Sequence, residues 1–186
     1  MNKLALTLSL LLLPLLTTFA YAKTVAGYDF NKYPIKVYTG KKAPLKLTKS
    51  DDWWFFRTRI RDIHHDGTVG FAGKYMVGIW GCGAGCIMGA MVDKSTGKVY
   101  GLPIGENTPY DLGCSHKFDN PLENERVVFF PNSRLFVTRD CENEQIGNSN
   151  QYLEKYTFNM YLWDEKTKKF KLTKKVHKTQ TTIRDW

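Results

Sequence analysis

The chain has 186 residues, of which 42% are hydrophobic and 24% are charged, and its formal net charge is +9. This length suits one ordinary domain with a single core, so we expect no second domain. The positive charge favours an acidic partner, and we expect a protein or an anionic envelope component and no nucleic acid; a basic face that only maintains solubility is an equal alternative.

The first 22 residues have the order of a secretory signal peptide. Lys3 precedes the apolar run 4–16, and Ala20-Tyr21-Ala22 supplies the small residues of a cleavage site. The run is shorter than a membrane-spanning helix, which makes a retained anchor the weaker alternative. We therefore predict a periplasmic or secreted protein, with residues 1–22 as the signal peptide, 23–186 as a single globular domain and no membrane span after cleavage.

The elements at the start of the mature chain differ in character. Segment 23–49 is polar and punctuated by prolines, so we predict irregular structure with one or two edge strands at 35–38 and 45–47. Ser50 is a natural N-cap, and the two aspartates after it favour a helix start. Apolar side chains then follow the three-and-four spacing of one helical face, at Trp53, Phe56, Ile60 and Ile63.

After the helix, the pattern changes to strands. Residues rich in β-branched and aromatic side chains predict strands at 71–80, 87–92, 98–102, 127–130, 134–138, 156–163 and 170–172. The two predicted hairpin turns have weakly similar sequences, in which the matching residues are separated by one constant offset. We call this similarity the echo. The matched residues are Asp93, Thr96 and Lys98 in the first turn and Asp164, Thr167 and Lys169 in the second. These features predict an α+β fold, with one N-terminal helix packed on a mainly antiparallel, meandering β-sheet.

Four cysteines lie in the mature part of the chain, at Cys82, Cys86, Cys114 and Cys141. An even number behind a signal peptide indicates two disulfides, and three connectivities are open. We favour Cys82 with Cys86, because the small residues between them let the backbone curl tightly, and Cys114 with Cys141. The second pair would tether the long aperiodic connection 104–125.

Several stretches, spread over roughly residues 55–172, carry a family resemblance. They are 55–61, 71–75, Trp80-Gly81-Cys82-Gly83 with Cys86, 93–103, 132–137 and 161–164. In these stretches the chain resembles a group of small exported bacterial proteins with a Trp-Gly-Cys-Gly signature and no established function. The resemblance implies a bacterial, periplasmic protein with a helix followed by an antiparallel sheet. The Cys114 segment and Cys141 depart from that pattern.

The Cys82–Cys86 loop is the strongest candidate for chemistry. A structural disulfide is the favoured interpretation, a thiol-redox or soft-metal role comes second, and an anion site built on Gly83 and Gly85 comes third. The remaining candidates are weaker. We expect no catalytic set, cofactor or metal, because neither the paired histidines His64-His65 nor the Cys114-Ser115-His116 run has the spacing that such sites need.

Two surfaces are candidates for binding. Trp54, opposite the apolar helix face and beside Arg57 and Arg61, suits contact with a protein or glycan. The Lys-rich end 166–178 reads as a protected edge strand or, less strongly, as a basic binding stripe that includes Lys169 and Lys171.

We therefore predict a non-enzymatic, exported binding protein, such as an inhibitor or an immunity protein. The alternatives are a redox or metal-handling protein that acts through Cys82 and Cys86, and a binder of an anionic envelope polymer.

Overall fold

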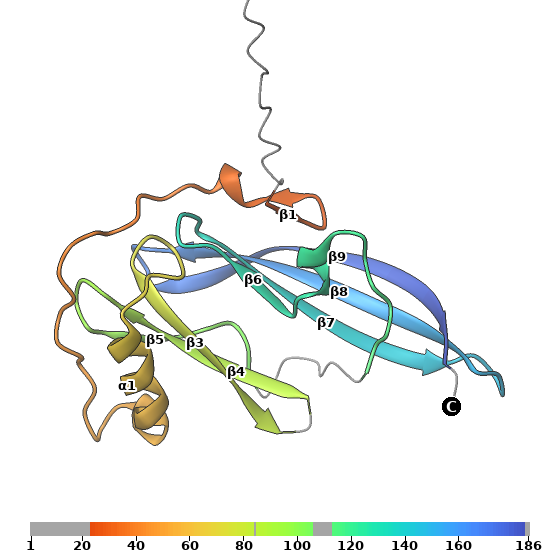
Figure 1. Cartoon of the computed structure of the whole chain (residues 1–186), viewed down its shortest axis with the longest axis horizontal. Helices are drawn as coiled ribbons and strands as arrows, with labels where there is room; N and C mark the ends of the chain where they lie inside the picture. The colour runs from red at the N-terminus through yellow and green to blue at the C-terminus, as the bar shows by residue number, and fades with distance from the viewer. Residues whose placement is uncertain (1–22, 84, 106–112, 185–186) are drawn as a thin grey trace, which may run out of the picture.

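The computed structural model describes residues 23–83, 85–105 and 113–184 (Figure 1). The predicted signal peptide lies outside these residues. The helical elements are η1 (Phe30–Lys32), η2 (Asp52–Phe56), α1 (Arg57–Asp66) and η3 (Pro121–Asn124). The strands are β1 (Thr24–Val25), β2 (Tyr28–Asp29), β3 (Tyr75–Gly83), β4 (Cys86–Asp93), β5 (Val99–Gly101), β6 (Val127–Phe129), β7 (Leu135–Gln145), β8 (Gln151–Asp164) and β9 (Lys169–Ile183).

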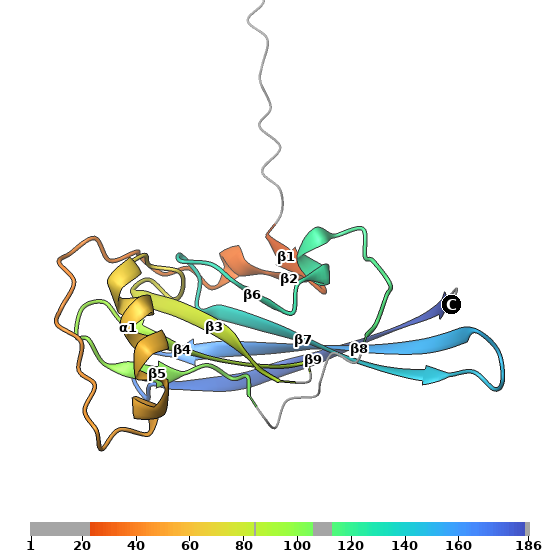
Figure 2. The same ribbon diagram turned by 60° about the horizontal axis from the view of Figure 1, so that its bottom comes forward.

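The predicted fold class is confirmed: one helical segment packs on antiparallel strands. The structure adds that the described strands divide into three sheets, in the orders β1-β2, β3-β4-β5 and β6-β7-β8-β9. α1 covers one face of the three-stranded sheet, and the other face of that sheet packs on the four-stranded sheet (Figure 2). The opposite face of the four-stranded sheet is covered by β1, β2 and η3. Apolar side chains fill the three interfaces between α1, the three-stranded sheet, the four-stranded sheet and the segment of β1, β2 and η3.

The helix forms where the apolar spacing predicts it, with a different start. Asp51 and not Ser50 is the N-cap of η2, and its carboxylate accepts hydrogen bonds from the backbone N–H and the hydroxyl of Thr48 instead of capping the helix. This single 3₁₀ turn continues directly into α1. The helix ends at Gly67, whose φ of +70° and N–H bond to the Ile63 carbonyl form a left-handed C-cap.

The helix approaches the sheet closely at one glycine. Ile60 and Ile63 point into the layer between α1 and the sheet, where they meet Met76, Ala90 and Val92. A Cβ atom at Gly78 would lie 2.4 Å from the Ile63 side chain, so the absence of a side chain there permits this packing.

The two runs predicted as edge strands, 35–38 and 45–47, are not strands. They run past the turn ends of the sheets, so they make isolated hydrogen bonds in place of a ladder: the Tyr38 N–H bonds the Gly73 carbonyl at 2.6 Å and the Lys46 N–H bonds the Gly97 carbonyl at 2.8 Å. The short strands of this region are β1 and β2.

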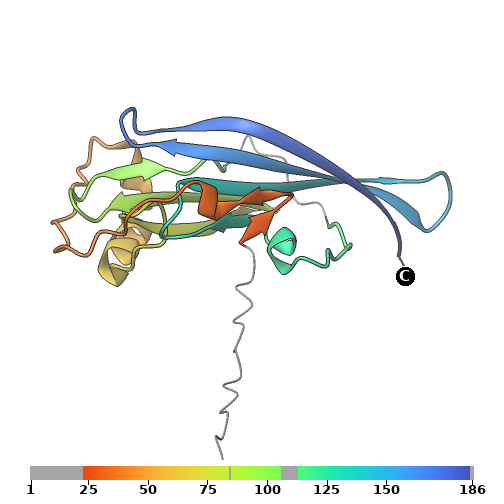
Figure 3. The same cartoon turned by 90° about the horizontal axis from the view of Figure 1, so that it is seen from above.

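The strand predicted from residue 71 begins only at Tyr75. Residues 71–75 form a tight turn, with the Tyr75 N–H bonded to the Phe71 carbonyl at 2.9 Å and with positive φ at Ala72 and Gly73. The later strands β7, β8 and β9 are longer than predicted, because polar residues continue the ladders beyond their apolar parts. β9 forms an edge of its sheet, as expected for the Lys-rich end (Figure 3).

Candidate functional site

The start of the helix and the tip of the β3–β4 hairpin form one continuous surface. The Phe56 ring lies against the Trp80 ring, with centroids 5.4 Å apart, and this contact fixes η2 beside the end of β3. A groove of about 460 Å³ runs between the start of the helix and the end of β3. Its lining includes Phe55, Arg59, Trp80, Cys82 and Met88. The Phe55 side chain is 87% exposed at the rim of this groove.

The hairpin tip is closed by a disulfide between Cys82 and Cys86, as predicted. Gly83 and Gly85 have φ of +104° and +78°, conformations that L side chains rarely adopt, so the glycines let the chain turn tightly enough for the sulfurs to meet. Cys86 is buried and Cys82 is exposed. The exposed residue Cys82 therefore lines the groove, at the disulfide that joins β3 to β4.

The predicted binding residues of the helix, Trp54, Arg57 and Arg61, are close to Phe55 and Arg59 in the chain but do not line the groove. The guanidinium carbons of Arg57 and Arg61 stand 5.5 and 5.8 Å from the centre of the Trp54 ring, which they half bury. Arg57, Arg59 and Arg61 are exposed, and none of them forms an ion pair within the described ranges. We call the set Trp54, Phe55, Arg57, Arg59, Arg61, Trp80 and Cys82 the helix–hairpin surface.

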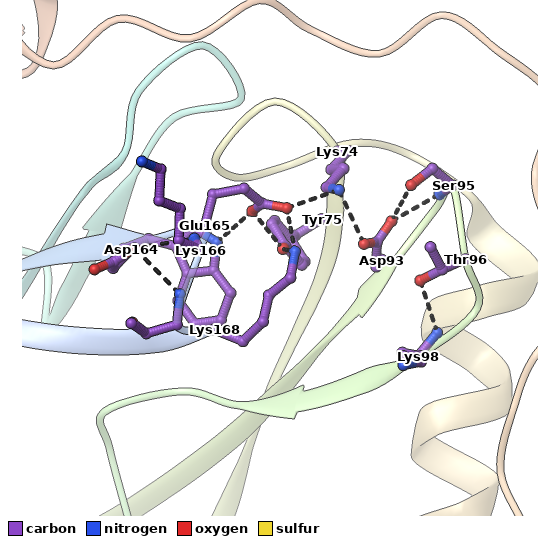
Figure 4. Close-up of polar contacts among 12 residues, drawn as sticks. Lys74, Tyr75, Asp93, Ser95, Thr96, Lys98, Asp164, Glu165, Lys166 and Lys168 are labelled. Atoms are coloured by element: carbon purple, nitrogen blue, oxygen red, sulfur yellow. Dashed lines mark hydrogen bonds and ion pairs between the residues drawn. The ribbon is translucent and has the colours of Figure 1, made fainter.

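A second cluster, which the sequence interpretation missed, joins the two sheets at their turns (Figure 4). The Lys74 ammonium lies 3.1 Å from an Asp93 carboxylate oxygen and 2.8 Å from a Glu165 carboxylate oxygen. Glu165 also accepts hydrogen bonds from the Tyr75 hydroxyl at 2.7 Å and the Trp163 indole at 2.8 Å, and it pairs with Lys168. The one signal for this cluster was the echo between the turns that carry Asp93 and Asp164.

The charges of this cluster suit a network of ion pairs that holds the two sheets together, and we call this network the clamp. Burial raises the pKa of Glu165, but the hydrogen bonds from Lys168, Lys74, Tyr75 and Trp163 outweigh burial and hold its pKa at about 2. Burial and the bond to Glu165 raise the pKa of Tyr75. A general acid or base works best with a pKa near the ambient pH. These groups keep one charge state over the physiological range, which favours a structural role.

The second predicted disulfide, Cys114–Cys141, is also present. Beside it, the fully buried Glu154 carboxylate accepts bonds from both backbone N–H groups of Ser115 and His116, at 2.8 and 3.0 Å, and from the Tyr156 hydroxyl at 2.6 Å. Burial raises the pKa of Glu154, but these bonds lower it to about 2. The disulfide and the carboxylate together fasten the described part of the 104–125 connection to the sheet.

The predicted lysines of the C-terminal end are separate from the helix–hairpin surface. Lys169 and Lys171 are exposed on β9, and Lys171 pairs with Asp164 at 2.8 Å. The Lys171 ammonium and the backbone N–H groups of the turn donate hydrogen bonds to the Asp164 carboxylate, and these bonds lower its pKa. The structure therefore does not bring together all the residues predicted for binding.

The described residues offer neither a cluster of metal ligands nor a membrane-spanning helix. In residues 23–83, 85–105 and 113–184, no three or more His, Cys, Asp or Glu side chains gather closely enough to hold a metal ion. His64 instead makes a contact of 2.8 Å to the Ala43 carbonyl, at the opposite end of α1 from the Cys82 loop. No helix among these residues has the length and apolar character of a membrane span.

Two closed disulfides are typical of an oxidising location outside the cytoplasm.

Comparisons with known proteins add no further identification: no family model matches the chain, and neither a curated protein nor a solved structure matches it significantly.

Proposed function

We propose that this protein is an exported binding protein of the bacterial envelope and that it contacts an acidic protein partner through the helix–hairpin surface. The observation that carries the proposal is the 87% exposure of Phe55 beside a groove walled by Trp80 and Cys82. Burying a phenylalanine side chain in a partner would stabilise the complex by roughly 2 kcal/mol.

The composition of the surface supports a protein partner. Aromatic residues and arginine are the residue types that carry most binding energy at protein interfaces. Because Arg57, Arg59 and Arg61 lack ion pairs within the described chain, their guanidinium groups are available to carboxylates. Carboxylates of the partner would satisfy these arginines, which is why we propose an acidic partner.

The rigidity of the surface supports the same proposal. The Cys82–Cys86 disulfide fixes the hairpin tip, and the Phe56–Trp80 contact fixes the helix against it. A preorganised surface loses less conformational freedom on binding, so more of the contact energy contributes to affinity. Inhibitors and immunity proteins are binding proteins that depend on such rigid contact surfaces.

A test uses the mature protein with a photo-crosslinking residue in place of the exposed Thr58, which also lines the groove, and extract from the envelope of the producing cells. Phe55→Ala should lower the yield of a stoichiometric crosslinked partner about tenfold. Ile146→Ala is the matched control, because Ile146 is also exposed, at 42%, and lies in the β7–β8 turn away from the helix. Equal yields from both variants, or no crosslinked partner at low salt, would contradict the proposal.

A thiol-redox function is the second candidate, favoured by the exposure of Cys82. Exposed disulfides are more readily reduced than buried ones. Titration with a graded series of thiol redox buffers, followed by mass mapping, distinguishes the two candidates. A Cys82–Cys86 bond that opens as readily as the disulfide of a redox enzyme would favour the redox function, and a bond as resistant as Cys114–Cys141 would favour the binding function.

A further inference from the structure

Among the residues that the structure describes, β9 presents a long edge without a strand partner. It is 15 residues long, and within the described residues its only strand neighbour is β8. No hydrogen bond from any other described element reaches the β9 backbone between its first and last residue. The outer backbone N–H and carbonyl groups of β9 therefore have no hydrogen-bond partner in another described element, along the side of the sheet that Figure 3 shows as a curved border.

The exposed charges of this edge are positive. Lys169, Lys171, Lys174 and Lys175 are exposed, and of these only Lys171 forms an ion pair with a described residue. Adjacent strand residues point to opposite faces, so Lys174 and Lys175 place an ammonium group on each side of the edge. By the β8–β9 register, Lys169, Lys171 and Lys174 share one face of the sheet and Lys175 lies on the other, so a strand added here would lie beside one row of positive charge.

We propose that the outer edge of β9 binds an extended acidic segment of a partner protein as an additional strand of the sheet. Strand addition obtains its affinity from main-chain hydrogen bonds and its specificity from alternate side chains. Carboxylates at alternate positions of the added segment all point to one face, where they would lie beside Lys169, Lys171 and Lys174. This site is independent of the helix–hairpin surface and does not rest on the function proposed for that surface.

The lysines also determine which occupants are excluded. Lysine on an edge strand discourages pairing with neutral or basic strands. A second copy of β9 is disfavoured for the same reason, because antiparallel pairing about the middle of the strand would bring Lys174 opposite Lys178 or Lys175 opposite Lys174. Acidic residues turn this repulsion into attraction, so the edge selects by charge.

The test measures binding of a fluorescent peptide of alternating Glu and Thr, about eight residues long, the typical length of a strand. A second peptide of the same sequence, with every backbone nitrogen methylated, keeps the charge and removes the hydrogen-bond donors. The unmethylated peptide should bind, should slow hydrogen exchange of β9 amides, and should bind about tenfold more tightly than the methylated one.

Protein variants separate the edge from the overall charge of the molecule. Lys174→Glu with Lys175→Glu should weaken binding about tenfold, whereas Lys36→Glu with Lys41→Glu, the same charge change on exposed lysines of the N-terminal segment, should weaken it less than about twofold. Equal loss in both variants, equal binding of both peptides, or no binding at low salt would overturn the proposal. Polyphosphate that matches the unmethylated peptide in affinity would also overturn it in favour of charge attraction alone.

Discussion

The two meanders of this protein, β3-β4-β5 and β7-β8-β9, contain the same type of turn and differ in the elements that surround it. In the first meander the Gly97 N–H bonds the Asp93 carbonyl at 2.7 Å, and in the second the Lys168 N–H bonds the Asp164 carbonyl at 2.8 Å. Both donor residues have positive φ, +75° at Gly97 and +55° at Lys168. The echo in the sequence therefore corresponds to the same turn built twice.

The difference lies in the support that each hairpin needs. The β3–β4 hairpin is short, is closed at its tip by Cys82–Cys86, and is covered by the helix. The β7–β8 hairpin extends further, and its extension is held by Cys114–Cys141 and by the Glu154 carboxylate. A local crosslink is enough for the short ribbon, whereas the long one needs a crosslink to a distant segment.

The largest expected effect comes from removing the distant crosslink. C114S/C141S should lower the free energy of unfolding by about 3.5 kcal/mol, because the disulfide closes a loop of 27 residues. C82S/C86S should cost about 2 kcal/mol, because its loop spans only 4 residues. Urea unfolding of both variants measures the difference, and equal losses would show that the two hairpins are supported alike.

The next effect tests why glycine occupies the turn of the first meander. Gly97→Ala should cost about 3 kcal/mol, because positive φ strains alanine and the new Cβ would lie 1.8 Å from the Pro44 carbonyl oxygen. Gly83→Ala is the control, since it also has positive φ but has open space around the Cβ. The control should cost about 1 kcal/mol by the same unfolding measurement. A cost at Gly97 no larger than at Gly83 would mean that the crowding is relieved by movement.

Acid should loosen the long hairpin through Glu154. The pKa of Glu154 is lowered in the folded protein from 4.5 to about 2, so its stabilisation is full above pH 4.5 and is lost as the pH falls toward 2. We expect this to amount to about 3 kcal/mol between pH 6 and pH 2, and Glu154→Gln should remove that part of the pH dependence. Unfolding followed between pH 2 and 6 checks it, and an unchanged slope in the variant would contradict it.

The clamp between the turns gives the fourth prediction. Lys74→Met should cost about 2 kcal/mol, because it leaves the Asp93 carboxylate, which is 1% exposed, without its counter-ion. Lys168→Met removes a lysine from the partly exposed Glu165 and from the Tyr75 hydroxyl, and it should cost about half as much. Thermal unfolding at low and high salt compares the two variants, and the opposite order would contradict the placement of Lys74 between the sheets.

The smallest effect concerns the turn of the second meander. Lys168→Gly relieves a positive φ, worth about 1 kcal/mol, and removes the ion pair with Glu165, worth up to about 1 kcal/mol. The free energy of unfolding should therefore change by less than about 0.5 kcal/mol. A loss as large as that of Lys74→Met would assign the clamp to Lys168 instead.

Much of the local structure was predictable from the sequence, because neighbouring residues decide it. The apolar face at Phe56, Ile60 and Ile63 predicts the helix, and alternating residues predict the hairpins. Glycines beside Cys82 and Cys86 predict their disulfide, since a short loop limits which sulfurs can meet. The predictions were wrong where the chain runs past the ends of sheets, at 35–38 and 45–47, because a strand needs a partner that local sequence does not reveal.

Only the tertiary structure decided how the helix and the two larger sheets meet. Lys74, Asp93 and Glu165 come from three separate turns, and each alone reads as a solvated charge. The same holds for the groove between Phe55 and Cys82, whose walls are brought together by the packing of the helix on the sheet. Periodicity encodes which side of an element is apolar, while the neighbour that this side meets depends on how all the elements pack.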